Sequence, residues 1–464
     1  MTQFGRTRRI HFVGVGGIGM SGIAELLVNL GYGVSGSDAK RTPLTDRLAA
    51  LGVRVAIGHD AVNLGEADVV VTSSAVRADN PEVAAARQRH VPVIPRAEML
   101  AELMRLRFGI AIAGSHGKTT TTSMVALALE RAGLDPTAVI GGRLSAFGSN
   151  ARLGRGACMV AEADESDRSF LKLSPSIAVI TNIDHEHMEA YGTFDRLLDA
   201  FVDFADKVPF YGAVVACIDD PHVRSILPRF SRRVITYGFA DDADVQGVHA
   251  TTDGRRGRCE VLHGVLEVGV PGLHNLQNAL AAVAVGLELG VPFEHIAAAL
   301  AEFGGADRRY QIKGTVGGVT VVDDYGHHPT EIAAVLRAAR AGAPRRVVAV
   351  FQPHRYTRTR DLLAQFGEVL AGADVTLLTE IYPAGEAPIP GVSSSAMADA
   401  IRRHGRGTVE LVPSLDALPS RVAEIATDGD VVLTLGAGSI GAVGDKIVAA
   451  LQARAAVDAP VVHP

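Results

Sequence analysis

Residues 108–133, FGIAIAGSHGKTTTTSMVALALERAG, contain an apolar run, a glycine-rich turn and a helical pattern in direct succession. The same order recurs in RRIHFVGVGGIGMSGIAELL at residues 8–27 and in GDVVLTLGAGSIGAVGDKIVAAL at residues 429–451. Buried strands that alternate with helices are typical of α/β domains with mainly parallel sheets. The sequence therefore predicts an α/β fold whose ligands bind at the carboxyl ends of the strands, where these turns lie.

The length of the chain suggests several domains. It has 464 residues, which at roughly 150 residues per domain corresponds to about three. We predict a first α/β domain over residues 1–107, a central nucleotide-binding domain over residues 108–310 and a third α/β domain over residues 311–464. The last boundary lies in the charged segment Asp307-Arg308-Arg309-Tyr310.

Composition excludes several classes of protein. The formal net charge of -6 lacks the basic excess of a nucleic-acid-binding domain. The cysteines, Cys158, Cys217 and Cys259, are far apart and are predicted to be buried thiols in a reducing compartment. No stretch reaches the roughly 18 uncharged apolar residues of a membrane span. We expect a soluble cytoplasmic protein, a monomer or homodimer, with no nucleic-acid or membrane partner.

The turn in residues 114–120 has the features of a phosphate-binding loop. Its glycines allow backbone N–H groups to point at phosphates, and the following helix N-terminus favours negative charge. Lys118 can reach the outer phosphates and the Thr119 hydroxyl can hold Mg²⁺. Ile112 stands where the usual pattern has a further glycine, so this is a shortened form. The predicted ATP-binding residues are Gly114, Ser115, His116, Gly117, Lys118, Thr119 and Thr120.

The threonines after Lys118 and two polar clusters add to this prediction. Four consecutive threonines are poor helix material, and a bound nucleotide would explain them. Glu162 is the first acid after the apolar run of residues 158–161, and His187 lies in the cluster that follows residues 177–180. Mg²⁺ on a triphosphate needs only one or two carboxylates. Each cluster alone could also be a solvated turn.

The loop at residues 14–19, GVGGIG, fits the dinucleotide-binding fingerprint, with Asp38 about twenty residues further on. Taken alone, it indicates NAD or FAD and an oxidoreductase. Such a loop nevertheless binds any diphosphate at a helix N-terminus, including that of a UDP-sugar. The separate ATP loop favours the UDP-sugar, because a dehydrogenase does not hydrolyse ATP.

Two segments of the third domain combine donors and cations at strand ends. They are residues 323–331, DDYGHHPTE, and residues 352–360, QPHRYTRTR. Arginine suits the bidentate binding of a carboxylate, which an amino-acid substrate presents. The histidines could instead satisfy backbone carbonyls. Similarly, Asn275 and Asn278 could cap a helix or contact a purine.

Seven motifs occur in order across nearly the whole chain: GVGGIGMSG, GSHGKTTTT, AEADESD, TNID followed by HEHM, HNLQNALAA, DDYGHHPTE and QPHRYTRT. Together they resemble the Mur ligases, most closely the alanine-adding members. The lysine loop alone is shared with folylpolyglutamate synthases, whereas the first loop together with DDYGHHPTE is more specific. The resemblance implies a UDP-binding Rossmann-like domain over residues 1–107, a central P-loop ATPase domain over residues 108–310 and a C-terminal Rossmann-like domain over residues 311–464 that closes over the site.

The resemblance also implies roles for individual residues. Lys118 would contact the ATP phosphates, Thr119 and Glu162 would hold Mg²⁺, and His187 would hold a second metal ion. The residues implied near the adenine and ribose of ATP are Asn275, Asn278 and Asp324. Those implied at the amino acid and the acyl phosphate are Tyr325, His327, His354, Arg355 and Arg358, with His327 or His354 steering or deprotonating the amine. Those implied at the UDP site are Gly16, Gly17, Gly19 and Ser37 or Asp38.

The chain departs from the family pattern at Glu186-His187, where Asp-His is common. A carbamylated lysine found in several relatives has no counterpart, as expected for alanine-adding members. The implied reaction is ATP-dependent addition of L-alanine to the carboxylate of UDP-N-acetylmuramate through an acyl phosphate, in peptidoglycan precursor synthesis. The alternatives are a murein-peptide ligase, an NAD-dependent oxidoreductase and a non-enzymatic P-loop regulator.

Overall fold

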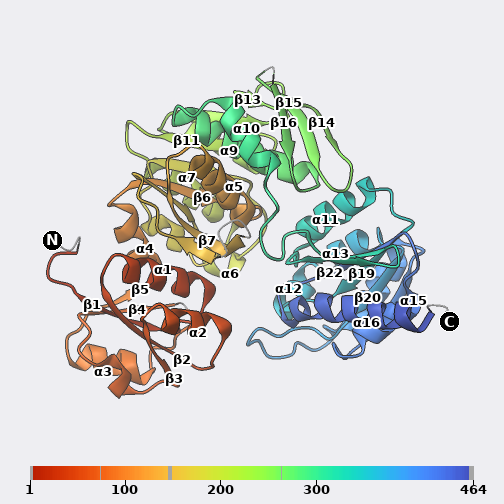
Figure 1. Cartoon of the computed structure of the whole chain (residues 1–464), viewed down its shortest axis with the longest axis horizontal. Coiled ribbons are helices and arrows are strands. Elements are labelled where there is room, and N and C mark those ends of the chain that lie inside the picture. Colours follow the sequence, from red (N-terminus) through yellow and green to blue (C-terminus); the bar gives the residue numbers. More distant parts are fainter. Residues whose placement is uncertain (1–3, 74, 145–148, 263, 459–464) are drawn as a thin grey trace, which may run out of the picture. The chain divides into compact units, whose positions relative to one another are not determined.

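The computed structural model describes residues 4–73, 75–144, 149–262 and 264–458. The chain forms two compact units, coloured along the sequence in Figure 1. The first unit comprises Met1–His249, Cys259–Leu266 and Gln277–Gly304. The second comprises Ala250–Arg258, Glu267–Leu276 and Gly305–Pro464.

The first unit begins with a five-stranded sheet of order β3-β2-β1-β4-β5, in which all neighbours are parallel. The strands are β1 (Arg9–Val13), β2 (Gly33–Asp38), β3 (Arg54–Ile57), β4 (Val69–Thr72) and β5 (Val93–Pro95). The accompanying helices are α1 (Ile18–Asn29), α2 (Pro43–Ala50), α3 (Pro81–Gln88) and α4 (Arg96–Met104). Strand order reverses on either side of β1, so the glycine loop after β1 lies at a topological switch point, where such sheets bind ligands.

The first unit also holds an eight-stranded sheet of order β13-β12-β11-β10-β6-β9-β7-β8. Its strands are β6 (Phe108–Ala113), β7 (Thr137–Leu144), β8 (Ser149–Arg152), β9 (Cys158–Glu162), β10 (Ile177–Ile180), β11 (Ala213–Cys217), β12 (Val234–Gly238) and β13 (Val245–Gln246). Only β8, at one edge, pairs antiparallel among the described pairs. β6 and β10 are continuous apolar runs because central parallel strands are covered on both faces.

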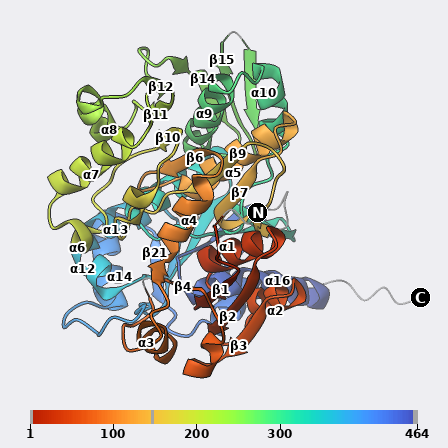
Figure 2. The ribbon, with the colours of Figure 1, turned by 90° about the vertical axis from the view of Figure 1, so that its left-hand side faces the viewer.

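Helix α5 (Lys118–Arg131) packs on β6, β7 and β9, and is visible with α7 (Phe194–Asp206) in Figures 1 and 2. It begins at Lys118, directly after Gly117, whose left-handed backbone provides the turn that opens it. The remaining helices of this part of the chain are α6 (Met188–Tyr191), α8 (Pro221–Ile226), α9 (Leu273–Glu288) and α10 (Phe293–Ala301).

A small sheet of order β14-β15-β16 was not predicted from the sequence. Its strands are β14 (Val248–Thr252), β15 (Gly257–Val261) and β16 (Gly264–Val268). Alternate residues of β15 are buried and exposed, as expected for a sheet with one covered face.

The second unit contains a six-stranded sheet of order β17-β18-β22-β19-β20-β21. Its strands are β17 (Gln311–Val316), β18 (Val319–Asp324), β19 (Arg346–Phe351), β20 (Val375–Leu378), β21 (Thr408–Leu411) and β22 (Asp430–Leu435). The pairing of β17 with β18 is antiparallel and the other pairs are parallel. The helices are α11 (Pro329–Ala341), α12 (Tyr356–Asp361), α13 (Leu363–Leu370), α14 (Ser394–His404), α15 (Leu418–Ile425) and α16 (Val443–Asp458).

Side chains of β19 alternate between two hydrophobic cores of this unit. Ala349 and Phe351 pack with apolar residues of α11, α13 and α14. Val348 and Val350 pack instead with α15 and α16. Helices therefore cover both faces of the sheet, and the predicted α/β class with mainly parallel sheets is confirmed. The predicted boundaries after residues 107 and 310 remain predictions.

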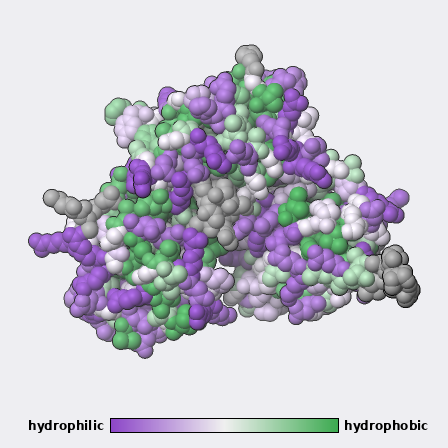
Figure 3. All heavy atoms as spheres, viewed as in Figure 1, coloured by the Kyte–Doolittle hydropathy of each residue, from purple (hydrophilic) through white to green (hydrophobic). Residues whose placement is uncertain are grey.

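Surface and burial agree with the simple expectations from composition. The three cysteines are free and buried. On the face drawn in Figure 3, hydrophobic side chains form small groups among hydrophilic ones. No helix in the described part of the chain has both the length and the apolar character needed to cross a bilayer.

Candidate active site

The turn between β6 and α5 is held in a conformation that only glycine accepts. Gly114 has φ of 135°, and a Cβ there would lie 2.0 Å from Thr181 Oγ1 at the end of β10. Gly117 is left-handed, with φ of 80°, and it caps α5 without a side-chain hydrogen bond. The two glycines therefore bring the backbone of the turn against β10 and open the N-terminus of α5, as a phosphate-binding loop requires.

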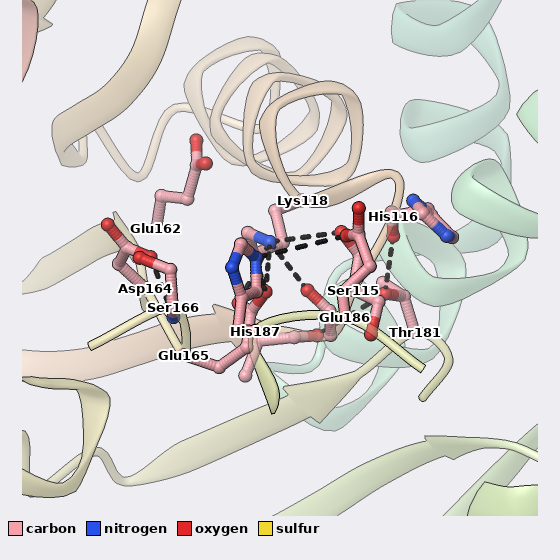
Figure 4. A network of polar contacts seen from close by, with 12 residues as sticks. Ser115, His116, Lys118, Glu162, Asp164, Glu165, Ser166, Thr181, Glu186 and His187 are labelled. Atoms are coloured by element: carbon pink, nitrogen blue, oxygen red, sulfur yellow. Dashed lines mark hydrogen bonds and ion pairs between the residues drawn. The ribbon is translucent and has the colours of Figure 1, made fainter. Parts of the chain in front are cut away.

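Lys118 is the first residue of α5, and its ammonium group folds back over the loop (Figure 4). Its Nζ donates to Gly114 O at 2.6 Å and Ser115 O at 3.1 Å, and forms an ion pair with Glu165 at 2.8 Å. Burial alone would lower the pKa of Lys118, but the surrounding carboxylates, Glu165 first, raise it. The side chain therefore stays cationic beside the helix N-terminus where phosphates are expected.

Thr119 and Glu162 lie together, as the resemblance implied. Thr119 Oγ1 donates to Glu162 Oε2 at 3.0 Å, and Gly141 N donates to the same oxygen at 2.8 Å. A hydroxyl and a carboxylate at hydrogen-bond distance are oxygen donors of the kind Mg²⁺ prefers. Their chemistry fits a magnesium ion on the triphosphate, and their role as metal ligands remains a prediction.

His187 lies on the other side of Lys118, among carboxylates. Its Nε2 is 3.7 Å from Glu165 Oε1 and 3.9 Å from Glu186 Oε2, and its backbone is left-handed with φ of 59°. The substitution of glutamate for the usual aspartate at Glu186 thus keeps a carboxylate near the histidine. Burial raises the pKa of Glu165, and Lys118 opposes that effect. The arrangement fits a second cation site that the loop lysine also faces.

Ser115 and His116 fasten the loop to the segment after β10. Asp184 N donates to Ser115 Oγ at 2.8 Å, while His116 Nε2 lies 2.9 Å from Asp184 Oδ2. His116 N also donates to Asn182 Oδ1 at 2.8 Å. These contacts assign both side chains a part in holding the loop.

The run Thr119-Thr120-Thr121-Thr122 is buried inside α5, despite the low helix propensity of threonine. Thr122 Oγ1 donates to Lys118 O at 2.8 Å, and Thr121 Oγ1 donates to Asn278 Oδ1 at 3.1 Å. Back-bonding to the preceding turn and a partner on α9 satisfy these hydroxyls. The run therefore needs no nucleotide to account for it.

Asn278 lies next to the loop, and Asn275 lies near the start of α9. A Cβ on Gly117 would lie 2.7 Å from Asn278 Oδ1, so the amide is adjacent to the loop. Asn275 Nδ2 donates to Pro271 O at 2.6 Å, at the N-terminal end of α9. The helix-cap and purine alternatives for both asparagines remain predictions.

The first glycine loop borders a cavity of about 290 Å³ that also reaches the central sheet. Its wall contains Gly17 and Gly19 on one side and Glu162 and Asp164 on the other. Gly16 N donates to Asp38 Oδ2 at 2.9 Å, so Asp38 closes the loop from behind. The diphosphate loop and the predicted magnesium carboxylate therefore share one cavity.

Ser37 does not line this cavity. It is fully buried, and its hydroxyl donates to Glu82 Oε2 at 2.7 Å. His11 Nε2 contacts the same oxygen at 2.6 Å, and His59 Nδ1 lies 3.0 Å from Ser37 Oγ. In this structure the Ser37 side chain belongs to a buried polar network, while its backbone oxygen accepts from Gly14 N and Val15 N of the loop. Both Ser37 and Asp38 therefore contact the loop, and their part in binding UDP remains a prediction.

Four residues predicted to bind the amino acid gather in the second unit. The Tyr325 and His327 rings meet at 5.3 Å, the His327 and His354 rings at 5.7 Å, and Arg358 Nη1 lies 3.4 Å from His354 Nδ1. Burial lowers the pKa of His354 to about 4, and the nearby His327 and arginines act in the same direction. His354 is therefore a neutral imidazole at pH 7 and able to accept a proton.

Asp324 and Arg355 are the sequence neighbours of Tyr325 and His354. Asp324 accepts from Tyr310 N at 2.7 Å and Gly326 N at 2.6 Å, and burial raises its pKa to about 6. Arg355 has a positive φ of 72° at the residue before α12. These positions put both residues at the carboxyl ends of β18 and β19, where parallel sheets bind ligands.

Sequence reasoning missed three charged residues of the first unit. Asp164 and Glu165 belong to the quoted motif AEADESD, but spacing alone does not say which acid faces the lysine. Arg96 lies in no motif, yet it lines the cavity and its Nη2 is 3.4 Å from Asp164 Oδ2. The signal for Arg96 was its place directly after β5, at the same sheet edge as the glycine loop.

Three family models match successive parts of the chain. Residues 9–108 match the "Mur ligase family, catalytic domain", residues 112–286 the "Mur ligase middle domain" and residues 308–438 the "Mur ligase, glutamate ligase domain". The matched segments follow the order of the three predicted domains.

Individual relatives are similar over almost their whole length. The UDP-N-acetylmuramate–L-alanine ligase of Geobacter sulfurreducens is 55% identical over 458 residues, which cover 97% of this chain and 99% of the relative. The same-named protein of Anaeromyxobacter sp. is 56% identical over 453 residues, covering 97% and 99%. The structure is similar to the crystal structure of UDP-N-acetylmuramate-alanine ligase MurC from Thermotoga maritima, with a TM-score of 0.81 and 30% identity over 96% of this chain and 99% of that one. It is also similar to a murein peptide ligase from Psychrobacter arcticus, with a TM-score of 0.70 and 25% identity over 96% and 98%. The matched domains and these full-length relatives establish that the chain belongs to the Mur ligase family.

Proposed function

We infer that this chain is an ATP-dependent ligase that joins L-alanine to the carboxylate of UDP-N-acetylmuramate, in peptidoglycan precursor synthesis. One observation carries the inference: a single cavity is bordered by the diphosphate loop at Gly17 and Gly19 and by Glu162, the partner of Thr119 beside the lysine loop. A sugar nucleotide held at that loop would direct its acid toward ATP. The full-length relatives named for this reaction supply the identity of the two substrates.

The reaction needs activation because a carboxylate is a poor electrophile and oxide is a poor leaving group. A carboxylate oxygen attacks the γ-phosphorus of ATP, which gives an acyl phosphate and ADP. The nitrogen of L-alanine then attacks the acyl carbon, phosphate leaves, and the nitrogen loses a proton to give the amide. Phosphoryl transfer of this kind depends on positioning and charge stabilisation more than on covalent catalysis.

Each side of the reaction has a proposed set of residues. Lys118 stabilises negative charge on the transferred phosphoryl group, and Thr119 and Glu162 would hold Mg²⁺ with His187 near a second ion. Magnesium, when bound, neutralises charge on the triphosphate. Arg358 and Arg355 bind carboxylate or phosphate oxygens, and neutral His354, with His327 beside it, takes the proton of the amine.

The test is phosphate release by the purified chain with ATP, magnesium and UDP-N-acetylmuramate, with amino acids added singly. We expect L-alanine to stimulate release most strongly, and the product to carry one added alanine by mass spectrometry. Stronger stimulation by a murein tripeptide would favour the murein-peptide ligase. A protein that ignored every amino acid, or that oxidised NADH, would refute the ligase. Its cytoplasmic location and its state as monomer or homodimer remain predictions.

A further inference from the structure

Arg96 spans the distance between the first glycine loop and the acids of the central domain. It is the first residue of α4, and its guanidinium lies against Gly19 of α1 and 3.4 Å from Asp164 Oδ2. A Cβ on Gly19 would be 2.6 Å from Arg96 Nη1, so glycine at that position leaves room for the arginine. The arginine thus connects the two walls of the cavity.

Arg96 is a single cationic side chain among the acidic side chains of this cavity lining, as far as the structure describes it. Among the described residues that line it, Arg96 is the one with a cationic side chain, and Glu162 and Asp164 are the acids. A cation beside the N-terminus of α1 is disfavoured by the helix dipole. Asp164 offsets that effect in this structure by pairing with Arg96. The distance from Arg96 Nη2 to Asp164 Oδ2 is 3.4 Å, which is long for an ion pair, and 40% of the Asp164 side chain is exposed. A partly exposed pair of this kind is weak, so an incoming anion can replace the carboxylate at little cost.

The proposed substrate carries anionic groups that would bind in the cavity beside Arg96. A sugar nucleotide with an acid group carries a diphosphate for the glycine loop and a carboxylate that must reach ATP. We propose that Arg96 binds an oxyanion of the sugar nucleotide, taking it in place of Asp164, and so holds the acid in line with the lysine loop. This inference rests on the proposed function. The planar guanidinium suits either oxyanion because it donates two parallel hydrogen bonds.

The first test compares Michaelis constants. For Arg96→Gln we expect the KM for UDP-N-acetylmuramate to rise about ten- to hundred-fold, because a charge-assisted hydrogen bond is lost. The KM values for ATP and for L-alanine should stay within about two-fold of wild type. Arg96→Lys should recover part of the loss. Arg105→Gln is the matched control, because Arg105 lies at the other end of α4 and pairs with Glu102 on the surface. An unchanged KM in folded Arg96→Gln, with a thermal transition like that of wild type, would overturn the proposal.

A second test identifies which oxyanion Arg96 binds. Calorimetric titration with UDP-N-acetylglucosamine measures diphosphate binding without the acid group, and UDP-N-acetylmuramate measures both. Weakened binding of both ligands by Arg96→Gln assigns the diphosphate, and weakened binding of the muramate alone assigns the carboxylate. Equal affinities of variant and wild type for both ligands would refute the role.

A double-mutant cycle tests the contact with Gly19. Gly19→Ala should displace the guanidinium and weaken sugar-nucleotide binding about ten-fold, but it should have little further effect in Arg96→Gln. Additive effects would contradict the proposed link. A wild-type protein inactive with all three substrates would refute the proposed function itself, whereas an active wild type with an unaffected arginine variant would refute only this inference.

Discussion

At the scale of single residues, Lys118 has a role that one substitution can separate from folding. We expect Lys118→Ala to abolish phosphate release, because the charge that faces the γ-phosphoryl group is lost, while UDP-N-acetylmuramate still binds in the first domain. The measurements are a phosphate-release assay and a binding titration. Lys207→Ala, at an exposed helix end, is the control. Full phosphate release by Lys118→Ala would contradict the assignment.

The same substitution should also affect stability, because Glu165 is 1% exposed and would lose its partner. Removal of one member of a buried ion pair typically costs roughly 3–5 kcal/mol. Lys118→Ala combined with Glu165→Ala should recover part of that loss without recovering activity. This pair of results would distinguish the structural contribution of Lys118 from its chemical one.

His354 predicts the pH dependence of amide formation. Its pKa is lowered to about 4, mainly by burial, so the ring is deprotonated and able to accept a proton throughout the range from pH 5 to 8. We expect no acid limb near pH 6.5 in kcat/KM for L-alanine, and a fall of about 10²–10⁴ in rate for His354→Gln. The experiment is a pH profile of wild type and variant. A limb near pH 6.5 that disappeared in His354→Gln would show the pKa assignment to be wrong.

The residues of the site were only partly predictable from sequence. Lys118, Thr119 and Glu162 come from motifs whose chemistry is local, and the structure brings them together. Arg96 and Asp164 meet across 68 positions of sequence, and no local sequence pattern encodes that meeting. Ser37 shows a different limit, because its backbone contacts the glycine loop while its hydroxyl belongs to a buried network that no local sequence pattern reveals.

At the scale of elements, Glu82 joins α3 to the first sheet. This fully buried carboxylate accepts hydrogen bonds from residues of β1, β2 and the segment after β3. Burial would raise its pKa, but the contacts with His11, Ser37 and Asn63 lower it to about 2. We expect Glu82→Gln to lower the free energy of unfolding by about 3 kcal/mol, measured by urea unfolding at pH 7.

The sign of the pH effect follows from the lowered pKa. A carboxyl that ionises more readily in the folded state contributes stability above its unfolded pKa of about 4.5. That contribution is lost as the pH falls toward about 2. The stability difference between wild type and Glu82→Gln should therefore shrink from pH 4.5 downward. A difference that stayed constant down to pH 2.5 would contradict the ionised state of Glu82.

The elements that the sequence predicted were those with a simple burial pattern. The apolar run that opens residues 108–133 forms β6, because a central parallel strand is covered on both faces and its sequence is continuously apolar. Strands β14 to β16 were missed because exposed residues interrupt their apolar pattern and they lack the glycine turn and helix used as a guide. The antiparallel edge strand β17 was missed for the same reason.

At the scale of the whole molecule, the two compact units predict a separable response to ligands. We expect UDP-N-acetylmuramate alone to slow amide exchange in peptides that cover residues 14–20. When L-alanine and a non-hydrolysable ATP analogue are also present, we expect slower exchange in peptides that cover residues 325–328 and 354–358. Hydrogen exchange with mass spectrometry measures both. Protection of the second unit by the sugar nucleotide alone, with none at residues 14–20, would contradict the assignment of the sites.

The tight fit of Gly114 against Thr181 limits how this enzyme could evolve. Any side chain at Gly114 would collide with the end of β10, and its backbone angle excludes other residues as well. The conformation of the turn is therefore fixed when the chain folds, and a nucleotide that binds there as proposed would meet a preorganised loop. An inhibitor that fills this corner would contact a turn in which Gly114 accepts no other residue, so resistance would have to arise at other positions.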